Sequence, residues 1–245
     1  MRDNKPSVIA AAYDLKAAFD LAAALMRGGM SVEVYTSAQY RDGCAAQAAV
    51  YDTESFFMQP EEEYALLEKL FRCAPKECLC FMKTDSSLRG NVGSELAALR
   101  DARNADSLLF IPAFPKARKF TQNGVQYQLG ADGQKRDALG NGAQLINGFR
   151  NTAVSCGPLN RRGMGEGCVH VADCASQEAF DGMIQEMAGS RWDALAGTSA
   201  LAEELASICG LEKRAEPLCM PEAALRIDGK PGMLRLDTLE WKEAE

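Results

Sequence analysis

The sequence predicts an α/β protein built on a doubly wound, mainly parallel sheet with helices on both faces. Short apolar runs that are typical of buried strands alternate along the chain with longer segments whose apolar residues recur at helical spacing. The 245 residues are 47% hydrophobic and 25% charged, which is enough apolar material for a substantial core. An irregular insertion around residues 113–165 interrupts the alternation, and we expect a hairpin within it.

The first half of the chain shows the clearest alternation of strands and helices. Strands are expected at residues 7–12, 31–35, 48–52, 78–83 and 107–112. Helices are expected at residues 15–27, 60–74 and 92–104. Asp14 can cap the first helix and Gly28-Gly29 is typical of its end, while Pro60 suits the first turn of the second helix. Because parallel strands place their carboxyl ends at one edge of a sheet, the loops after these strands should share that edge.

The second half of the chain begins with the irregular insertion. Asn123-Gly124 favours a type I′ turn, so residues 120–129 are predicted to form a hairpin. Strands are then expected at 167–172 and 191–195, and helices at 176–188 and 198–209. Residues 210–245 carry no strong pattern and are expected to be a partly extended tail. We therefore predict one domain over residues 1–209, followed by a carboxyl-terminal extension over 210–245.

Charge and hydropathy exclude two classes of protein. The net charge of −7 argues against a general nucleic-acid binder. No apolar run approaches the roughly 18 residues of a membrane span, and no charged-then-apolar leader opens the chain. We therefore expect a cytoplasmic protein that contacts neither nucleic acid nor membrane.

The sequence carries few of the residues and motifs that metal binding, nucleotide binding or nucleophilic catalysis require. The nine cysteines are irregularly spaced without a C-x-x-C pair, and the single histidine, His170, lies in an apolar stretch, so reduced thiols and no metal site are expected. There is no G-x-x-x-x-G-K-S/T phosphate loop, and Gly163-x-Gly165-x-Gly167 precedes a predicted strand instead of a helix. We expect this chain itself to bind no cofactor.

One block, KTDSSLRGNVG at residues 83–93, has the character of a ligand-binding turn. It joins a predicted strand to a predicted helix, whose amino end offers unpaired N–H groups. The candidate binding residues in this block are Lys83, Asp85, Ser86, Ser87, Arg89 and Gly90. Lys83 and Asp85 alternate onto one face, the serine hydroxyls can hydrogen-bond, and Arg89 can grip a carboxylate. The alternative is a capped helix with a surface salt bridge.

Two further loops should reach the same edge of the sheet. The loop after the first strand carries Asp14 and Lys16, although Asp14 can equally be a plain helix cap. The loop at 112–118 carries Arg118 between two prolines and the hairpin, although it can equally be a stiff connector. If these loops converge, their cations predict a pocket for a small anion.

The same residues resemble a known family. Residues 83–96 are similar to the K-x-D-S-T-L-R-G-N-x-G-x-E-L signature of the four-carbon acid sugar kinases, the DUF1537 family. Residues 12–20, 52–55, 112–124, 169–173 and 197–202 resemble its other landmarks, so the likeness runs from about residue 7 to 205. The resemblance implies an amino-terminal α/β domain that binds a small sugar acid. The resemblance also implies that ATP and Mg would come only with a separate nucleotide-binding domain or subunit, which we expect to be absent from this chain.

Five positions depart from the family pattern. Tyr13 stands where the first motif has an aspartate, Lys16 replaces its threonine, and Ala17 replaces its glycine. Phe56 stands where D-T-E-S-R has its arginine, and Ala117 replaces the glycine before Arg118. These changes should reshape the pocket wall and leave the residues for phosphoryl transfer incomplete, with Asp14 as the remaining candidate catalytic residue.

Three functional hypotheses follow. The first is a stand-alone domain that binds a small hydroxy-carboxylate or its phosphate, with Arg89 and Arg118 on the carboxylate, and with Asp85 and the two serines on hydroxyls. The second is the substrate-binding half of a split, ATP-dependent four-carbon acid sugar kinase, active only with a separate nucleotide-binding subunit. The third is a non-catalytic interaction module. Each hypothesis leaves open a homodimer.

Overall fold

The computed structural model describes residues 6–105, 107–159, 167–211, 222–235 and 241–243. The described residues form an eleven-stranded sheet in the order β14-β13-β12-β2-β3-β1-β4-β11-β5-β10-β9. Its strands are β1 (Val8–Ala12), β2 (Val32–Tyr35), β3 (Ala48–Asp52), β4 (Leu79–Lys83), β5 (Ser107–Ile111), β9 (Val154–Gly157), β10 (Cys168–Ala172), β11 (Ala194–Gly197), β12 (Glu222–Ile227), β13 (Lys230–Arg235) and β14 (Trp241–Glu243). Every pair from β12 to β9 is parallel, and β13 and β14 add an antiparallel edge. The predicted doubly wound, mainly parallel sheet is confirmed.

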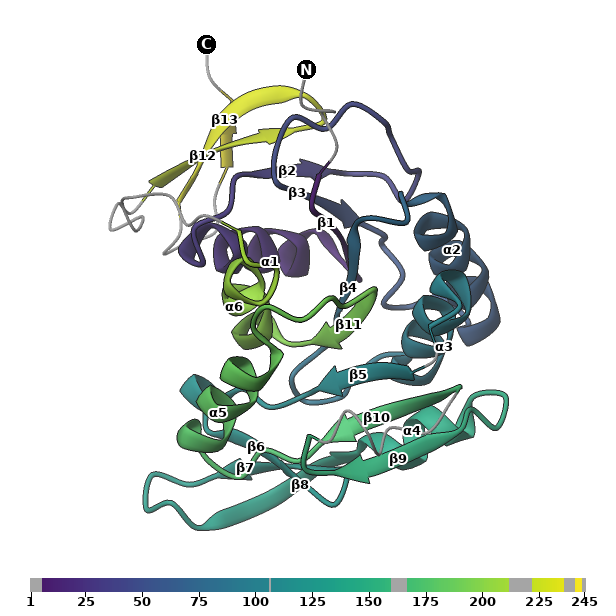
Figure 1. Cartoon of the computed structure of the whole chain (residues 1–245), viewed down its shortest axis with the longest axis vertical. Coiled ribbons are helices and arrows are strands. Elements are labelled where there is room, and N and C mark those ends of the chain that lie inside the picture. Colours follow the sequence, from purple (N-terminus) through teal and green to yellow (C-terminus); the bar gives the residue numbers. More distant parts are fainter. Residues whose placement is uncertain (1–5, 106, 160–166, 212–221, 236–240, 244–245) are drawn as a thin grey trace.

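Helices cover both faces of this sheet. The helices are α1 (Leu15–Arg27), α2 (Pro60–Cys73), α3 (Val92–Arg103), α4 (Gly142–Gly148), α5 (Gln177–Met187) and α6 (Ser199–Ile208). Figure 1 shows α1, α6 and α5 on one face and α2 and α3 on the other. Two apolar clusters follow this division: one includes Leu21 and Leu205, and the other includes Leu67 and Leu96. No helix in the described ranges is long and apolar enough to cross a membrane.

Local sequence signals set the ends of α1. The Asp14 carboxylate accepts a hydrogen bond from the Ala17 N–H at 2.6 Å, which confirms Asp14 as the helix cap. At the other end, a Cβ on Gly28 would lie 2.2 Å from the Glu203 carbonyl oxygen of α6. Glycine at position 28 therefore allows the end of α1 to pack directly against α6.

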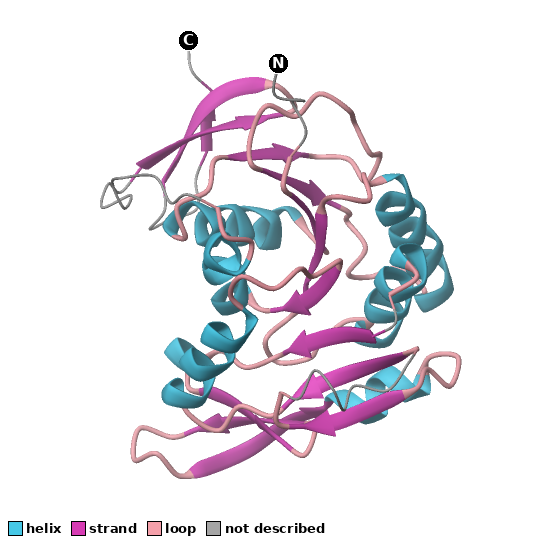
Figure 2. Cartoon of the chain, viewed as in Figure 1, coloured by secondary structure: helices cyan, strands magenta, loops and turns pink. Residues whose placement is uncertain are grey.

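The insertion contains a second, antiparallel sheet of three strands. These are β6 (Lys119–Gln122), β7 (Val125–Leu129) and β8 (Lys135–Asn141), which Figure 2 shows crossing beneath the main sheet. The predicted hairpin is confirmed: Asn123 and Gly124 have φ of 51° and 73°, as a type I′ turn requires. The strands β8 and β9 and the short helix α4 were not predicted, because short polar segments carry no clear period.

Two sequence-based expectations differ from the structure. The strand expected at 191–195 lies at Ala194–Gly197 instead. The described residues beyond 221 are not an extended tail: β12 pairs in parallel with β2, and the Thr36 N–H donates to Asp228 Oδ1 at 3.1 Å. The free edge of β2 supplies the pairing partner, and nothing local in residues 210–245 reveals that edge. Part of this segment lies outside the described residues.

Candidate functional site

A pocket opens at the carboxyl ends of β1 and β4, where the winding of the sheet reverses. The chain leaves β1 through α1 on one face of the sheet and leaves β4 through α3 on the other face (Figure 1). Ligands of open α/β sheets bind at such switch points. The pocket has a volume of about 360 Å³. It is lined by Tyr13, Asp14, Lys16, Ala17, Asp20, Phe56, Phe57, Lys83, Thr84, Asp85, Ser86, Arg89, Phe114, Thr198 and Ser199.

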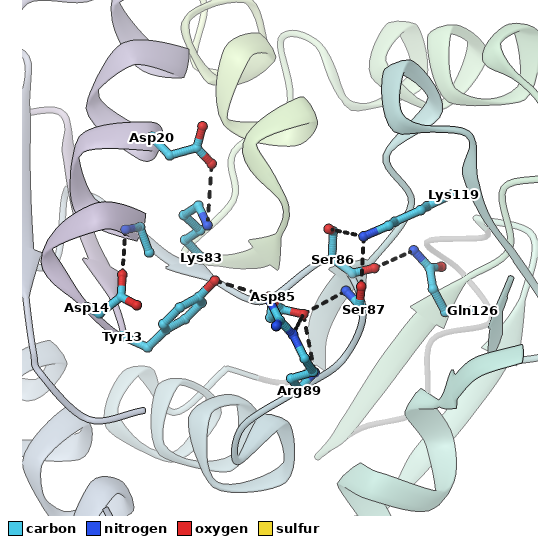
Figure 3. Close-up of polar contacts among 11 residues, drawn as sticks. Tyr13, Asp14, Asp20, Lys83, Asp85, Ser86, Ser87, Arg89, Lys119 and Gln126 are labelled. Atoms are coloured by element: carbon cyan, nitrogen blue, oxygen red, sulfur yellow. Dashed lines mark hydrogen bonds and ion pairs between the residues drawn. The ribbon is translucent and has the colours of Figure 1, made fainter. Parts of the chain in front are cut away.

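Lys83 places a buried cation on the floor of this pocket. The residue is 5% exposed, and its ammonium lies 3.6 Å from Asp20 Oδ2 and 5.0 Å from the centre of the Tyr13 ring. Burial lowers the pKa of the Lys83 ammonium, and the nearby Asp20 carboxylate opposes that shift. Figure 3 shows the Lys83–Asp20 pair. Ser199 donates a hydrogen bond to Asp20 at 2.6 Å, which orients the carboxylate.

Asp85 organises the turn that follows β4. Its Oδ1 accepts from the Ser87 N–H at 2.8 Å and from Arg89 Nε at 3.1 Å, and its Oδ2 accepts from Arg89 Nη2 at 2.6 Å (Figure 3). Burial raises the pKa of the Asp85 carboxyl, but the hydrogen bonds from Arg89 and Ser87 outweigh it and lower that pKa overall. The Arg89 side chain is 70% exposed, so Asp85 holds a cation at the mouth of the pocket.

Asp14 and Lys16 both reach the pocket from the loop after β1. Asp14 is half-buried and lines the pocket while its Oδ1 caps α1, so its role as a cap does not remove it from the pocket wall, and its contact with a ligand stays a prediction. Lys16 is exposed and lines the same wall.

The hairpin contributes Lys119 to the site region. Its ammonium donates to the Ser86 and Ser87 hydroxyls at 2.7 and 2.8 Å. Burial lowers the pKa of Lys119, and Asp85 opposes the shift. Arg118, the preceding residue, is exposed, does not line the pocket, and has φ of 55° where a short 3₁₀ turn ends. Lys119 was visible in the sequence as a basic residue near the loop, but only the hairpin decides which side chain turns inward.

Gln126 supports the turn from behind. Its side-chain amide donates to the Pro112 carbonyl at 2.7 Å and to the Ser86 carbonyl at 3.3 Å, and its carbonyl accepts from Thr121 at 2.6 Å. It is fully buried, so these bonds tie the 83–93 turn to the loop after β5. Sequence reasoning missed Gln126, because a glutamine in a hairpin carries no signal of its own.

The sequence-predicted residues therefore divide into two groups. Those that line the pocket are Asp14, Lys16, Lys83, Asp85, Ser86 and Arg89. Ser87, Gly90 and Arg118 lie outside its lining, with Ser87 turned toward Lys119. Asp20 and Ser199 line the pocket and were missed, because they sit inside or at the start of helices where polar residues are ordinary.

Two buried acids lie behind the polar floor. Glu95 is 2% exposed and Glu63 is fully buried, and the Ser94 hydroxyl donates to Glu63 at 2.6 Å. Burial, followed by repulsion from Glu63, raises the pKa of Glu95 well above its ordinary value. Among the described residues, no group of three or more histidine, cysteine or acidic side chains could hold a metal ion.

The fold and this site define an α/β domain with a polar pocket of mixed charge at the carboxyl ends of its parallel strands. Residues 9–141 match the model of the sugar-binding N-terminal domain family, so the chain belongs to that family. It is the amino-terminal domain found in the four-carbon acid sugar kinases, or DUF1537 proteins.

Similar proteins come from three bacteria. The D-threonate kinase of Salmonella typhimurium is 30% identical over 121 residues, which are 48% of this chain and 28% of the kinase. A DUF1537 protein of Bordetella bronchiseptica, solved as a domain-swapped dimer with bound citrate, superimposes with a TM-score of 0.65 and 18% identity over 83% of this chain and 56% of that one. A DUF1537 protein of Haemophilus influenzae superimposes with a TM-score of 0.65 and 18% sequence identity, over 85% of this chain and 57% of that one. The chain thus spans little more than half of the solved relatives' length.

Proposed function

We propose that this chain binds a small hydroxy-carboxylate, or its phosphate, in the pocket between β1 and β4. The observation that carries the proposal is the Lys83 ammonium, buried at 5% exposure and facing the pocket with an ion pair as long as 3.6 Å. A buried ammonium favours close, hydrogen-bonded partners, and an anion in the pocket would supply one.

The distribution of charge around the pocket suits an acid that also carries hydroxyl groups. Three cations line it, and they are Lys16, Lys83 and Arg89. Three carboxylates, Asp14, Asp20 and Asp85, also line it, so donors for a carboxylate alternate with acceptors for hydroxyls. Because these charges balance, affinity should depend on hydrogen-bond geometry more than on net attraction. The match to a sugar-binding family supports the same class of ligand.

Calorimetry with Arg89→Gln tests this proposal. Titration of threonate, erythronate and lactate should show binding, and loss of the Arg89 guanidinium should weaken it roughly tenfold to a hundredfold, as for a charged hydrogen bond. Arg72→Gln is a matched control, since Arg72 also pairs with an acid four residues away and is 65% exposed, but lies on α2 outside the pocket lining. No heat with any acid, or an equal loss in both variants, would contradict the proposal.

A second candidate function is the substrate-binding half of an acid-sugar kinase. It is favoured by the likeness to the Salmonella D-threonate kinase over 121 residues. In that case Asp14, whose Oδ2 is not used by the cap, would accept the proton of the attacking hydroxyl, and a nucleotide-binding domain or subunit would bring ATP and Mg. Phosphorus NMR of chain, threonate and Mg-ATP should show phosphothreonate only when such a domain is added. Phosphothreonate formed by this chain alone would contradict the need for a separate nucleotide-binding domain or subunit.

A further inference from the structure

The pocket has an aromatic wall that a small polyhydroxy acid would leave uncovered. Tyr13, Phe56, Phe57 and Phe114 all line it, beside the polar residues around Lys83, whose ammonium lies 5.0 Å from the centre of the Tyr13 ring. The Tyr13 and Phe56 ring centres are 5.1 Å apart, and the Phe56 and Phe57 centres are 5.0 Å apart with the rings at 88°. These are the spacings of aromatic pairs that pack on one another. The three rings thus form one continuous apolar surface, and Phe57 is 92% exposed at its end.

Backbone hydrogen bonds hold this surface in place. The Ser55 and Phe56 N–H groups both donate to the Tyr13 carbonyl, at 2.9 and 3.2 Å, and the Thr53 N–H donates to the Ala12 carbonyl at 2.9 Å. The loop after β3 is therefore fastened along the loop after β1. Phe56 also lies over Gly90, where a Cβ would meet its ring at 3.3 Å. The position of the Phe56 ring is thus set from two sides of the pocket.

Two of the five positions that depart from the family pattern contact each other. Tyr13 stands where that pattern has an acid and Phe56 where it has an arginine, so a pair of opposite charges is exchanged for a pair of packed rings. The Tyr13 hydroxyl still donates to Asp85 Oδ2 at 3.3 Å, so the polar floor is retained beneath the changed wall.

The pocket is also larger than a four-carbon acid requires. At about 30 Å³ for each water molecule, 360 Å³ equals the room of roughly twelve waters, whereas the four carbons and five oxygens of threonate are bonded and each take less room than a water. Every carbon of threonate carries an oxygen, so threonate offers no apolar face to the rings. Such a ligand would leave the aromatic side of the pocket facing water.

We propose that the ligand of this pocket is an acid with a flat apolar face, which stacks on the wall formed by Tyr13, Phe56 and Phe57 while its carboxylate and hydroxyl meet Arg89 and Lys83. The inference rests on the proposed function and names its ligand class. Two kinds of compound have this chemistry: aryl-substituted hydroxy acids, and sugar acids closed into a ring whose C–H groups form one face. Open-chain sugar acids lack it.

Matched pairs of ligands test the inference. Calorimetry should show that 3-phenyllactate binds at least roughly tenfold more tightly than lactate, which has the same acid and hydroxyl but no ring. Glucuronate compared with open-chain gluconate tests the ring sugar acids in the same way. Tighter binding of 3-phenyllactate than of lactate identifies an aryl-substituted hydroxy acid as the ligand class. A preference seen only for glucuronate over gluconate identifies a ring sugar acid instead.

Variants then assign the preference to the wall. Phe57→Ser removes an exposed ring, so the protein should stay folded while the affinity ratio within the preferred pair falls severalfold toward one. Leu145→Ser is the control, because Leu145 is another exposed apolar side chain, at 40%, that does not line this pocket; its ratio should be unchanged. Phe56→Arg restores the family residue and should reverse the preference.

The outcomes separate this inference from the proposed function. If the acids bind but neither pair shows a preference, or if Phe57→Ser and Phe56→Arg both leave the ratio unchanged, the aromatic wall does not select the ligand and the inference is wrong, while the proposed function stands. If no acid binds, the proposed function fails and the inference fails with it.

Discussion

Replacing Asp85 by asparagine should destabilise the protein, because this carboxylate is the centre of the 83–93 turn. The Asp85 side chain is buried at 5% exposure and accepts from the Ser87 N–H, from Tyr13, from the Arg89 N–H and twice from the Arg89 guanidinium. In the variant the amide oxygen can keep the Ser87 bond, but the amide nitrogen then faces the Arg89 guanidinium, which is also a donor. A charge-assisted pair becomes a donor–donor contact.

The magnitude follows from the burial of the two partners. Hydrogen bonds to a charged group contribute about 1.5–3 kcal/mol. Arg89 is 70% exposed and regains water when released, so we discount the loss to about 1–2 kcal/mol. For a chain of this size that corresponds to a fall in Tm of about 2–8 °C.

Thermal and urea unfolding of wild type, Asp85→Asn, Arg89→Gln and the double variant measure this loss. Because the folded-state pKa of Asp85 lies below its unfolded value, its contribution is complete above the unfolded pKa of about 3.8 and disappears as pH falls through the lower folded value. The gap between wild type and Asp85→Asn should therefore be constant near neutral pH and close only in acid. An unchanged Tm, or a double variant whose loss is the plain sum of the two single losses, would refute the assigned coupling.

Three further outcomes are expected. Glu95→Gln should be more stable than wild type at neutral pH. Because the folded-state pKa of Glu95 is raised, the wild-type protein has its full stability below the unfolded pKa of about 4.5 and loses stability as pH rises above it. Unfolding measured from pH 4 to 8 should therefore show a growing difference in stability in favour of the variant. Gly28→Ala should cost about 1–3 kcal/mol in urea unfolding, since its Cβ meets the Glu203 carbonyl at 2.2 Å; a loss near zero would mean that α1 and α6 can separate freely. Gln126→Leu leaves buried carbonyls unpaired, so it should cost about 1–3 kcal/mol and speed hydrogen exchange around Ser86; unchanged exchange there would contradict its supporting role.

Sequence reasoning worked where the signal is local. Helix α1 begins at the carboxylate cap of Asp14 and ends before Gly28, and the hairpin turns at Asn123-Gly124, because each depends on the conformations open to a few neighbouring residues. The 83–93 turn was recognisable for the same reason. Its assignment as a binding site stays a prediction, although six of the nine predicted binding residues line one pocket.

Contacts between residues far apart in the chain could not be predicted from these local signals. The strand β12 joins the sheet because β2 has a free edge, and the residues of β12 carry no record of that edge. Lys119 turns toward Ser86 while Arg118 stays exposed, since the twist of the hairpin decides between two adjacent cations. In both cases the deciding partner lies far away in the chain.

The sequence by itself determined the α/β class, the caps and turns, and the family to which the chain belongs, because these follow from short-range patterns. Only the tertiary structure decided that Asp20 lies between Lys83 and Ser199, and that two of the altered positions, Tyr13 and Phe56, pack against each other. Those contacts join side chains from separate elements at one edge of the sheet. The parallel winding of the strands brings them together, and no single stretch of residues encodes the resulting distances.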